Sequence, residues 1–243
     1  MSQTSIKTFG SLSQDGAQAP SPWELKVLVN DDNLTYLAFH TKTQEAVWVD
    51  PLTEDLELTI RLSNELRDYR FIAVIDTHTH ADHLSSAGDL ARALKTPLVM
   101  HRNAPSSRVD LRVSQDTQLS TAAGPLHLWL TPGHTWDGLT PSWGPFVFTG
   151  DTVFYGDTGR DDLPTGNPVE HYDSLQKLKS LLKPEHLILP GHDSKGGRLS
   201  NWATQLQINP ALSQTQEEYL RDAGAWVGPP PKLLKESLFH NFK

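Results

Sequence analysis

One segment of the chain places three histidines and an aspartate within six positions, shortly after an apolar run, and it constrains the fold more than any other feature. Residues 76–83 read Asp-Thr-His-Thr-His-Ala-Asp-His and follow directly after the apolar residues 71–75. The apolar run reads as a buried strand. Imidazole and carboxylate groups bind divalent metals, and the spacing H-x-H-x-D-H lets two ions be approached from one loop. The segment therefore predicts a metal site at a strand end.

The same arrangement, an apolar run that stops at a candidate ligand, occurs three more times. The runs and the ligands that follow them are 126–130 with His134, 146–148 with Asp151 and 186–189 with His192. A glycine stands directly before each of these ligands, which lets the backbone turn sharply there. Open sheets place their chemistry where strand ends meet in a common crevice. We therefore expect the four segments to contribute side chains to one cleft.

These residues resemble the ligand pattern of the metallo-β-lactamase superfamily. The matching positions are His78, His80, Asp82, His83, His134, Asp151 and His192. Asp50, in the run Val-Trp-Val-Asp-Pro, matches the aspartate that supports the ligands in that superfamily. The resemblance implies an α/β fold, the αββα sandwich, in which two mixed β-sheets face each other with helices on the outer faces. It also implies a metal cleft along one edge of the sandwich.

Length and composition agree with one such domain. A chain of 243 residues is within the range of a single large domain. The formal net charge of −8, without clustered Lys and Arg, argues against a nucleic-acid-binding face. The chain has no cysteine, so disulfides and thiolate ligands are excluded and the chemistry must use nitrogen and oxygen donors.

No stretch approaches the roughly 18 consecutive apolar residues of a membrane span, so no membrane association is expected. Residues 1–20 are rich in Ser, Gln, Gly and Thr and fit neither a secretory signal nor a transit peptide. We expect a disordered arm over 1–20, a single domain over 21–243 with a short C-terminal helical tail, and a cytoplasmic location.

Hydrophobic periodicity predicts the order of the other elements. Strands are expected over 23–29, 34–40, 46–49, 71–75 and 98–100. Helices are expected over 56–69, 86–96, 169–183 and 214–223.

Over residues 24–215 the chain looks most like the persulfide dioxygenases, the ethylmalonic-encephalopathy-type sulfur dioxygenases. Its tail is too short for the helical substrate domain of glyoxalase II. The discriminating element is Gly159-Arg160-Asp161-Asp162, which follows the candidate ligand Asp151, and Ile208-Asn209-Pro210-Ala211-Leu212 also supports the resemblance. Arg160 and Asp162 could equally form a structural pair that braces the loop, because Arg favours paired bonds with a carboxylate.

The resemblance implies one Fe(II) per chain, held by His78, His134 and Asp151. Two histidines and a carboxylate leave open positions for substrate and O₂, and a low-molecular-weight persulfide of the glutathione type would be oxidised to sulfite and thiol. His80 is a further candidate ligand. If His80 is not a ligand, it would act together with Asp82, His83 and His192 through hydrogen bonds that orient the ligands. Asp50 and Asp162 would support the ligands in the same way. Arg160, Lys195 and Arg198 are the candidates for binding substrate carboxylates.

The sequence departs from that family close to the ligands, and other functions stay open. Ser194 stands where the dioxygenases commonly have Tyr, and Gly156-Asp157 and Trp136-Asp137 replace other common residues. The main alternative is a zinc hydrolase of thioesters or lactones, with one or two Zn per chain and a second ion at Asp82, His83 and His192. A metal-binding scaffold without catalysis is a third reading, and a homodimer is a possible assembly.

Overall fold

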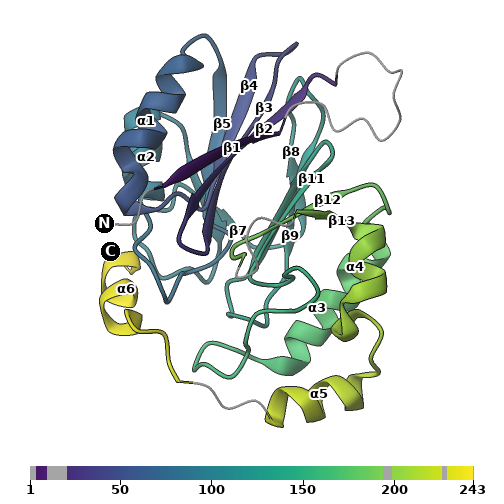
Figure 1. The fold of residues 1–243 in the computed structure, drawn as a ribbon. Coiled ribbons are helices and arrows are strands. Elements are labelled where there is room, and N and C mark those ends of the chain that lie inside the picture. Colours follow the sequence, from purple (N-terminus) through teal and green to yellow (C-terminus); the bar gives the residue numbers. More distant parts are fainter. Residues whose placement is uncertain (1–3, 10–20, 194–198, 226–228, 243) are drawn as a thin grey trace.

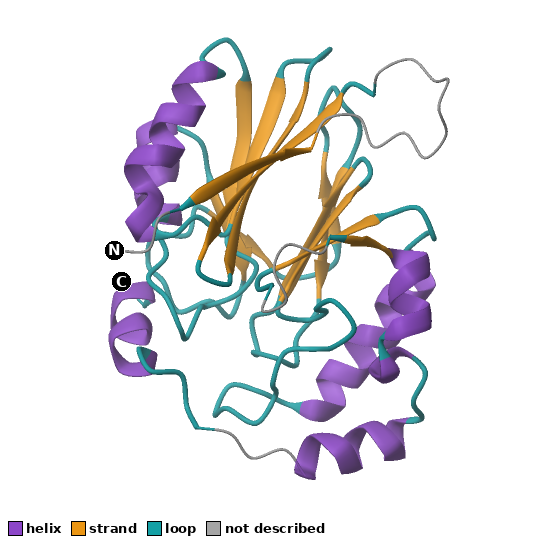
Figure 2. Cartoon of the chain, viewed as in Figure 1, coloured by secondary structure: helices purple, strands orange, loops and turns teal. Residues whose placement is uncertain are grey.

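Two mixed β-sheets face each other, and helices cover the outer face of each sheet (Figure 1, Figure 2). The computed structural model describes residues 4–9, 21–193, 199–225 and 229–242. The layers follow the order helix, sheet, sheet, helix. The predicted fold class, an αββα sandwich, is therefore confirmed.

The first sheet contains seven strands in the order in which they occur along the chain. Pairing is antiparallel from β1 to β4 and parallel from β4 to β7. The strands are β1 (Ser5–Phe9), β2 (Trp23–Asn30), β3 (Asn33–His40), β4 (Glu45–Val49), β5 (Arg70–Ile75), β6 (Leu98–His101) and β7 (Leu111–Val113). The parallel part needs crossover connections, and helices α1 (Leu56–Glu65) and α2 (Ala87–Leu94) provide the first two.

The second sheet has six strands in the order β13-β12-β11-β10-β9-β8, and only β11 and β12 among them run parallel. Its strands are β8 (Thr117–Leu119), β9 (Leu126–Leu130), β10 (Leu139–Trp143), β11 (Phe146–Gly150), β12 (Leu187–Pro190) and β13 (Ser200–Asn201). Helix α3 (Pro168–Leu181) connects β11 to β12, and α4 (Trp202–Ile208) follows β13. Both helices lie on the outer face of this sheet (Figure 1).

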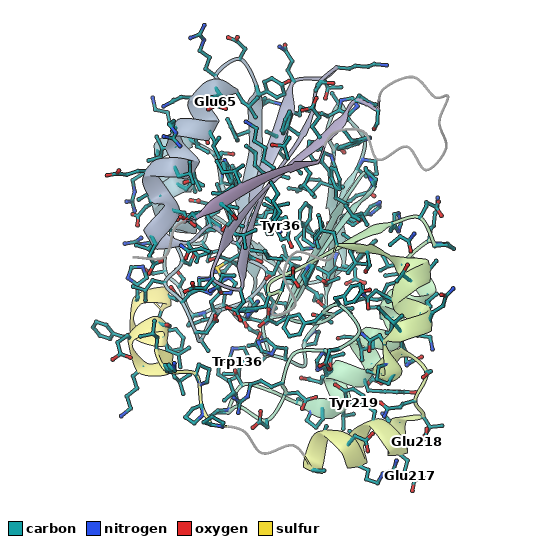
Figure 3. The ribbon with its side chains drawn as sticks, in the orientation of Figure 1. Tyr36, Glu65, Trp136, Glu217, Glu218 and Tyr219 are labelled. Carbon is teal, nitrogen blue, oxygen red and sulfur yellow. The ribbon has the colours of Figure 1, made fainter. Side chains whose placement is uncertain are left out.

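The main core lies between the sheets, and two further apolar clusters lie beneath the outer helices. Tyr36 on β3 is 1% exposed, and its ring packs edge-on against Phe148 of the second sheet. Its hydroxyl donates to the carbonyl oxygen of Pro190 at 2.6 Å, which satisfies the buried phenol and ties the two sheets together (Figure 3). The sheets are therefore held at a fixed separation close to the strand ends that carry the candidate ligands.

The C-terminal residues form two short helices below the sandwich, α5 (Gln216–Ala225) and α6 (Leu234–Asn241). Helix α5 packs on α3, and α6 lies below α1 and α2, on the opposite side of the molecule (Figure 1). Pro231, Lys232 and Leu233, just before α6, lie at the edge of the sandwich where the candidate ligands lie.

Several elements differ from the sequence expectations. The prediction of a disordered arm over 1–20 is wrong for residues 5–9, because these form β1, which pairs with β2 along its whole length. A main-chain ladder does not require apolar side chains, so composition does not reveal such an edge strand. Residues 1–3 and 10–20 lie outside the described part, and the division into an arm and one domain stays a prediction. In the described ranges, no helix has the length and apolar character needed to cross a bilayer.

Candidate metal centre

The candidate ligands follow strands of both sheets and meet at one edge of the sandwich. The loop with His78 follows β5 of the first sheet. His134, Asp151 and His192 follow β9, β11 and β12 of the second sheet. The structure therefore brings together all four segments that the sequence singled out.

The glycines before the ligands are needed for different reasons. Gly133 and Gly150 have φ values of 141° and 48°, in the region that favours glycine. A methyl group at Gly150 would also collide with the side chain of Thr77. Gly191 lacks a positive φ, but a methyl group there would collide with Oδ1 of Asp151. Close packing around the ligands therefore excludes larger residues at all three positions.

His78, His134 and Asp151 form a compact set of three potential ligands, whose donor atoms all lie within 4.8 Å of one another. Oδ2 of Asp151 lies 3.4 Å from Nε2 of His134 and 3.9 Å from Nε2 of His78. The buried Nε2 of His78 has no hydrogen-bond partner among the described residues. A buried polar atom without a partner requires an explanation, and a metal ion bound by this nitrogen supplies one. The donor set therefore fits a divalent transition metal.

Hydrogen bonds orient both imidazoles so that Nε2 is left for the metal. His134 donates from Nδ1 to the carbonyl oxygen of Arg160 at 2.6 Å. His78 donates from Nδ1 to Oγ1 of Thr77 at 3.0 Å, because that hydroxyl itself donates to Oδ2 of Asp50 at 2.9 Å. Partners of this kind fix the tautomer of a ligating histidine.

The protonation states of the three residues also suit a metal. Burial, together with the neighbouring His80, holds the pKa of His78 well below its usual value. Burial likewise lowers the pKa of His134. Burial alone would raise the pKa of Asp151, but the charge of His192 and the neighbouring His134 hold it well below its usual range. The centre therefore presents two neutral imidazoles and a carboxylate, the forms that a metal ion requires.

Asp50, which directly follows β4, supports this loop, as the sequence resemblance implied. It is 2% exposed and has a φ of 50°. Its Oδ1 accepts from the backbone N–H of Thr77 at 2.7 Å, in addition to the bond from the Thr77 hydroxyl. Asp50 therefore fixes the start of the loop immediately before His78.

His80 lies next to the triad but turns toward other carboxylates. Its Nε2 lies 3.3 Å from Oδ1 of Asp50 and 3.9 Å from Oδ1 of Asp76. Burial would lower the pKa of His80, but Asp50 raises it to about 9. Nε2 of His80 therefore faces the carboxylate of Asp50 and is not part of the compact set formed by His78, His134 and Asp151.

Asp82, His83 and His192 form a hydrogen-bonded group beside the triad. His192 donates from Nε2 to Oδ2 of Asp82 and from Nδ1 to Oδ1 of Asp151, both at 2.9 Å. His83 lies 3.2 Å from the same oxygen of Asp82. Burial would lower the pKa of His192, but Asp151 and Asp82 raise it well above its usual value. His192 therefore links two carboxylates as a cation and orients Asp151.

A cavity of about 980 Å³ opens beside the ligands. Its wall includes His134, Asp151 and His192 of the metal centre, residues of the 154–163 loop, and Pro231, Lys232 and Leu233 of the C-terminal segment. The volume is sufficient for a thiol-sized substrate. Lys232 is a cation in this wall that the sequence interpretation missed, because it lies far from every motif.

The expected substrate-binding residues have different outcomes. Arg160 lines the cavity, but its Nε and Nη2 donate to the two carboxylate oxygens of Asp162 at 2.7 and 2.8 Å. Its Nη1 donates to the carbonyl oxygen of Pro229 at 2.7 Å. The guanidinium therefore forms the bracing pair that the sequence left open. Lys195 and Arg198, like Ser194, lie outside the described residues.

A second buried network, missed by the sequence interpretation, supports the loop that contains Arg160. The hydroxyl of Tyr219 on α5 donates to Oδ2 of Asp161 at 2.9 Å (Figure 3). His171 on α3 is completely buried, and its Nδ1 lies 2.9 Å from the Tyr219 hydroxyl and 3.3 Å from Asp161. These residues are 10 to 58 positions apart. No local spacing could have revealed their contact.

Comparisons with known proteins agree with this geometry. Residues 124–192 match the sequence model of the metallo-beta-lactamase superfamily. The mitochondrial persulfide dioxygenase ETHE1 of Homo sapiens is 28% identical over 207 residues, which cover 82% of this chain and 79% of that protein. A probable polyketide biosynthesis zinc-dependent hydrolase, BaeB of Bacillus velezensis, is 30% identical over 169 residues, or 66% and 72% of the two chains. The crystal structure of ETHE1 from Myxococcus xanthus is 31% identical in sequence and superposes with a TM-score of 0.81. The match covers 90% of this chain and 97% of that one.

Proposed function

The chain belongs to the metallo-β-lactamase superfamily and is an enzyme, and we propose that it is an iron-dependent persulfide dioxygenase. The substrate would be a low-molecular-weight persulfide of the glutathione type. Persulfide, O₂ and water would give the thiol, sulfite and two protons. The terminal sulfur loses four electrons in this reaction, and O₂ accepts them.

The observation that carries the proposal is the separation of one triad from the other candidate ligands. His78, His134 and Asp151 converge, whereas Nε2 of His80 faces Asp50. Two histidines and one carboxylate on one face of an iron ion leave further positions open, which oxygenases require. The similarity to the ETHE1 proteins of Homo sapiens and Myxococcus xanthus supports the same assignment.

In this account the protein provides binding, orientation and electrostatics. Iron(II) would supply electron transfer between the persulfide sulfur and O₂ when bound. His78 and His134 would hold the iron through Nε2, since their Nδ1 atoms are engaged with Thr77 and Arg160. Asp151 would bind through Oδ2, because His192 occupies its Oδ1. The cavity would admit the persulfide beside this face of the triad.

Metal analysis of protein purified without added metal tests the proposal at the level of the cofactor. We expect about one iron per chain, as the separate triad requires. About two zinc per chain, with no iron, would contradict the proposal and support a hydrolase.

One observation keeps a dinuclear zinc hydrolase as the second candidate. His80, Asp82 and His83 form another group whose donor atoms lie within 4.8 Å of one another. Two ions would lower the pKa of a bridging water and polarise a carbonyl group. The similarity to BaeB supports this candidate. Hydrolysis of S-lactoylglutathione or a lactone by the zinc-loaded protein, without persulfide-dependent oxygen uptake by the iron-loaded protein, would favour it.

A further inference from the structure

The last helix of the chain returns to the loop that carries the H-x-H-x-D-H residues. The side chain of Asn241, at the end of α6, donates from Nδ2 to the carbonyl oxygens of His80 at 2.9 Å and His83 at 3.0 Å. Its Oδ1 accepts from the backbone N–H of Ser85 at 2.9 Å. One amide side chain therefore binds three backbone groups of this loop, up to 161 positions away in the sequence.

These bonds bracket Asp82, which lies between the two bound carbonyl groups. The position of Asp82 matters to the metal centre because its carboxylate accepts from His192 at 2.9 Å. His192 in turn donates to Oδ1 of Asp151 at 2.9 Å. A continuous path of hydrogen bonds and one short backbone segment therefore leads from Asn241 to a ligand of the triad.

The same C-terminal segment is held at its other end by the loop that supports the ligand His134. Arg160 donates to the carbonyl oxygen of Pro229 at 2.7 Å, and the backbone carbonyl of Arg160 accepts from His134. Between these two anchors, Pro231, Lys232 and Leu233 line the cavity. The segment from 229 to 241 thus spans the cavity and contacts a loop of the metal centre at each end.

We propose that Asn241 is a positioning residue of the metal centre. It holds residues 80–85 so that Asp82 and His192 keep Asp151 in its ligand orientation. This inference shares with the proposed function only the premise that the centre binds a metal ion, and it applies equally to iron and zinc. Partners that orient metal ligands typically change metal affinity about 10–100-fold when removed. Asn241 acts through several bonds, so we expect an effect near the lower end of that range.

The test uses the full-length protein loaded with Co²⁺. It measures the visible absorption spectrum and the rate at which a chelator removes the metal. Asn241→Ala should lose Co²⁺ about tenfold faster and shift the absorption bands. Asn241→Asp should behave similarly, because a carboxylate accepts from Ser85 but cannot donate to the two carbonyl oxygens. His240→Ala is the matched control, since His240 also contacts this loop, at the carbonyl of Ser85, but not the carbonyls of His80 and His83.

The proposal is supported if both Asn241 variants change metal loss and absorption while His240→Ala resembles the parent protein. It is overturned if the Asn241 variants lower only the melting temperature and keep the parent's metal-loss rate and spectrum, since Asn241 would then merely dock α6. Equal effects of His240→Ala on metal loss would also overturn it. The readouts do not use persulfide, so a parent protein that binds metal without oxidising persulfide would contradict the proposed function and leave this test intact.

Discussion

Nδ1 of His134 lies 2.6 Å from the carbonyl oxygen of Arg160, which is 26 positions further along the chain. This bond fixes the imidazole so that Nε2 faces Asp151. The Arg160 backbone is held in turn by the pairing of its side chain with Asp162 and by the bond from Gly159 N–H to the carbonyl of Asp151 at 2.9 Å. A methyl group at Gly159 would collide with that carbonyl. The loop is therefore a support for two ligands as well as a wall of the cavity.

The first prediction concerns the side chain of Arg160. Arg160→Lys keeps the charge but cannot form two parallel bonds with Asp162. We expect faster metal loss and a lower kcat, because the carbonyl that holds His134 becomes less well fixed. Metal release and steady-state kinetics measure these effects. Lys232→Ala, which removes another cation from the cavity wall, is the control for charge. A rise in KM for Arg160→Lys, with kcat and metal binding unchanged, would instead assign Arg160 to substrate binding.

The second prediction concerns the ligands themselves. His134→Ala and Asp151→Asn should each lose most bound metal and nearly all activity, because each removes a donor from a three-residue set. Metal content after gel filtration checks this expectation. His127→Ala is a suitable control, since His127 lies on β9, the strand that leads to His134, and stacks on Trp129 instead of joining the centre. Full metal retention by either ligand variant would exclude the triad.

The sequence located the segments that carry the candidate ligands better than the residues that hold those segments in place. The ligand segments could be found because each contains a short local pattern, an apolar run, a glycine and a donor. The orientation of His80 toward Asp50, and the contacts of Tyr219 and Asn241, depend on how distant segments pack. A single sequence contains no local signal for such contacts.

The same distinction applies to the fold. Long periodic segments such as α3 and the strands β2 to β6 were anticipated, with ends displaced by a few residues. The expected helix 56–69 ends at Glu65, where the chain turns before β5. Strands β7, β8 and β13 are only two or three residues long and were missed, because periodicity needs more residues than these to be recognised.

The third prediction concerns pH and the contact between the two sheets. Glu45 on β4 is 2% exposed and accepts from the backbone N–H groups of Ala122 and Ala123 and from Arg70. Burial would raise the pKa of Glu45, but these hydrogen bonds lower it from the usual value of 4.5. A lowered pKa stabilises the folded protein above the unfolded-state value, and this contribution disappears as the pH falls through the folded-state value.

Glu45→Gln should therefore lower the free energy of unfolding at pH 7 by about 1–3 kcal/mol. The difference from the parent should shrink as the pH falls below about 4.5. Denaturant unfolding at several pH values measures both effects. A difference that stays constant down to acid pH would show that the carboxylate charge contributes no stability.

The fourth prediction concerns Tyr219. Tyr219→Phe removes the hydroxyl that lies between Asp161 and His171, so two buried groups lose a partner. The free energy of unfolding should fall by about 1–2 kcal/mol. Tyr172→Phe is the matched control, because Tyr172 lies on α3 and its hydroxyl makes a longer bond of 3.4 Å, to the carbonyl of Gln214 just before α5. Equal stability changes in the two variants would contradict a special role for the Tyr219 network.

The most direct test of the central claim measures oxygen uptake by the iron-loaded protein. Given glutathione persulfide, the protein should consume O₂ and release one sulfite for each O₂, because both oxygen atoms go to the terminal sulfur. Glutathione alone should give no uptake, and Asp151→Asn should abolish the reaction. An iron-loaded protein that takes up no oxygen with persulfide, together with a zinc-loaded form that hydrolyses S-lactoylglutathione, would contradict the dioxygenase assignment.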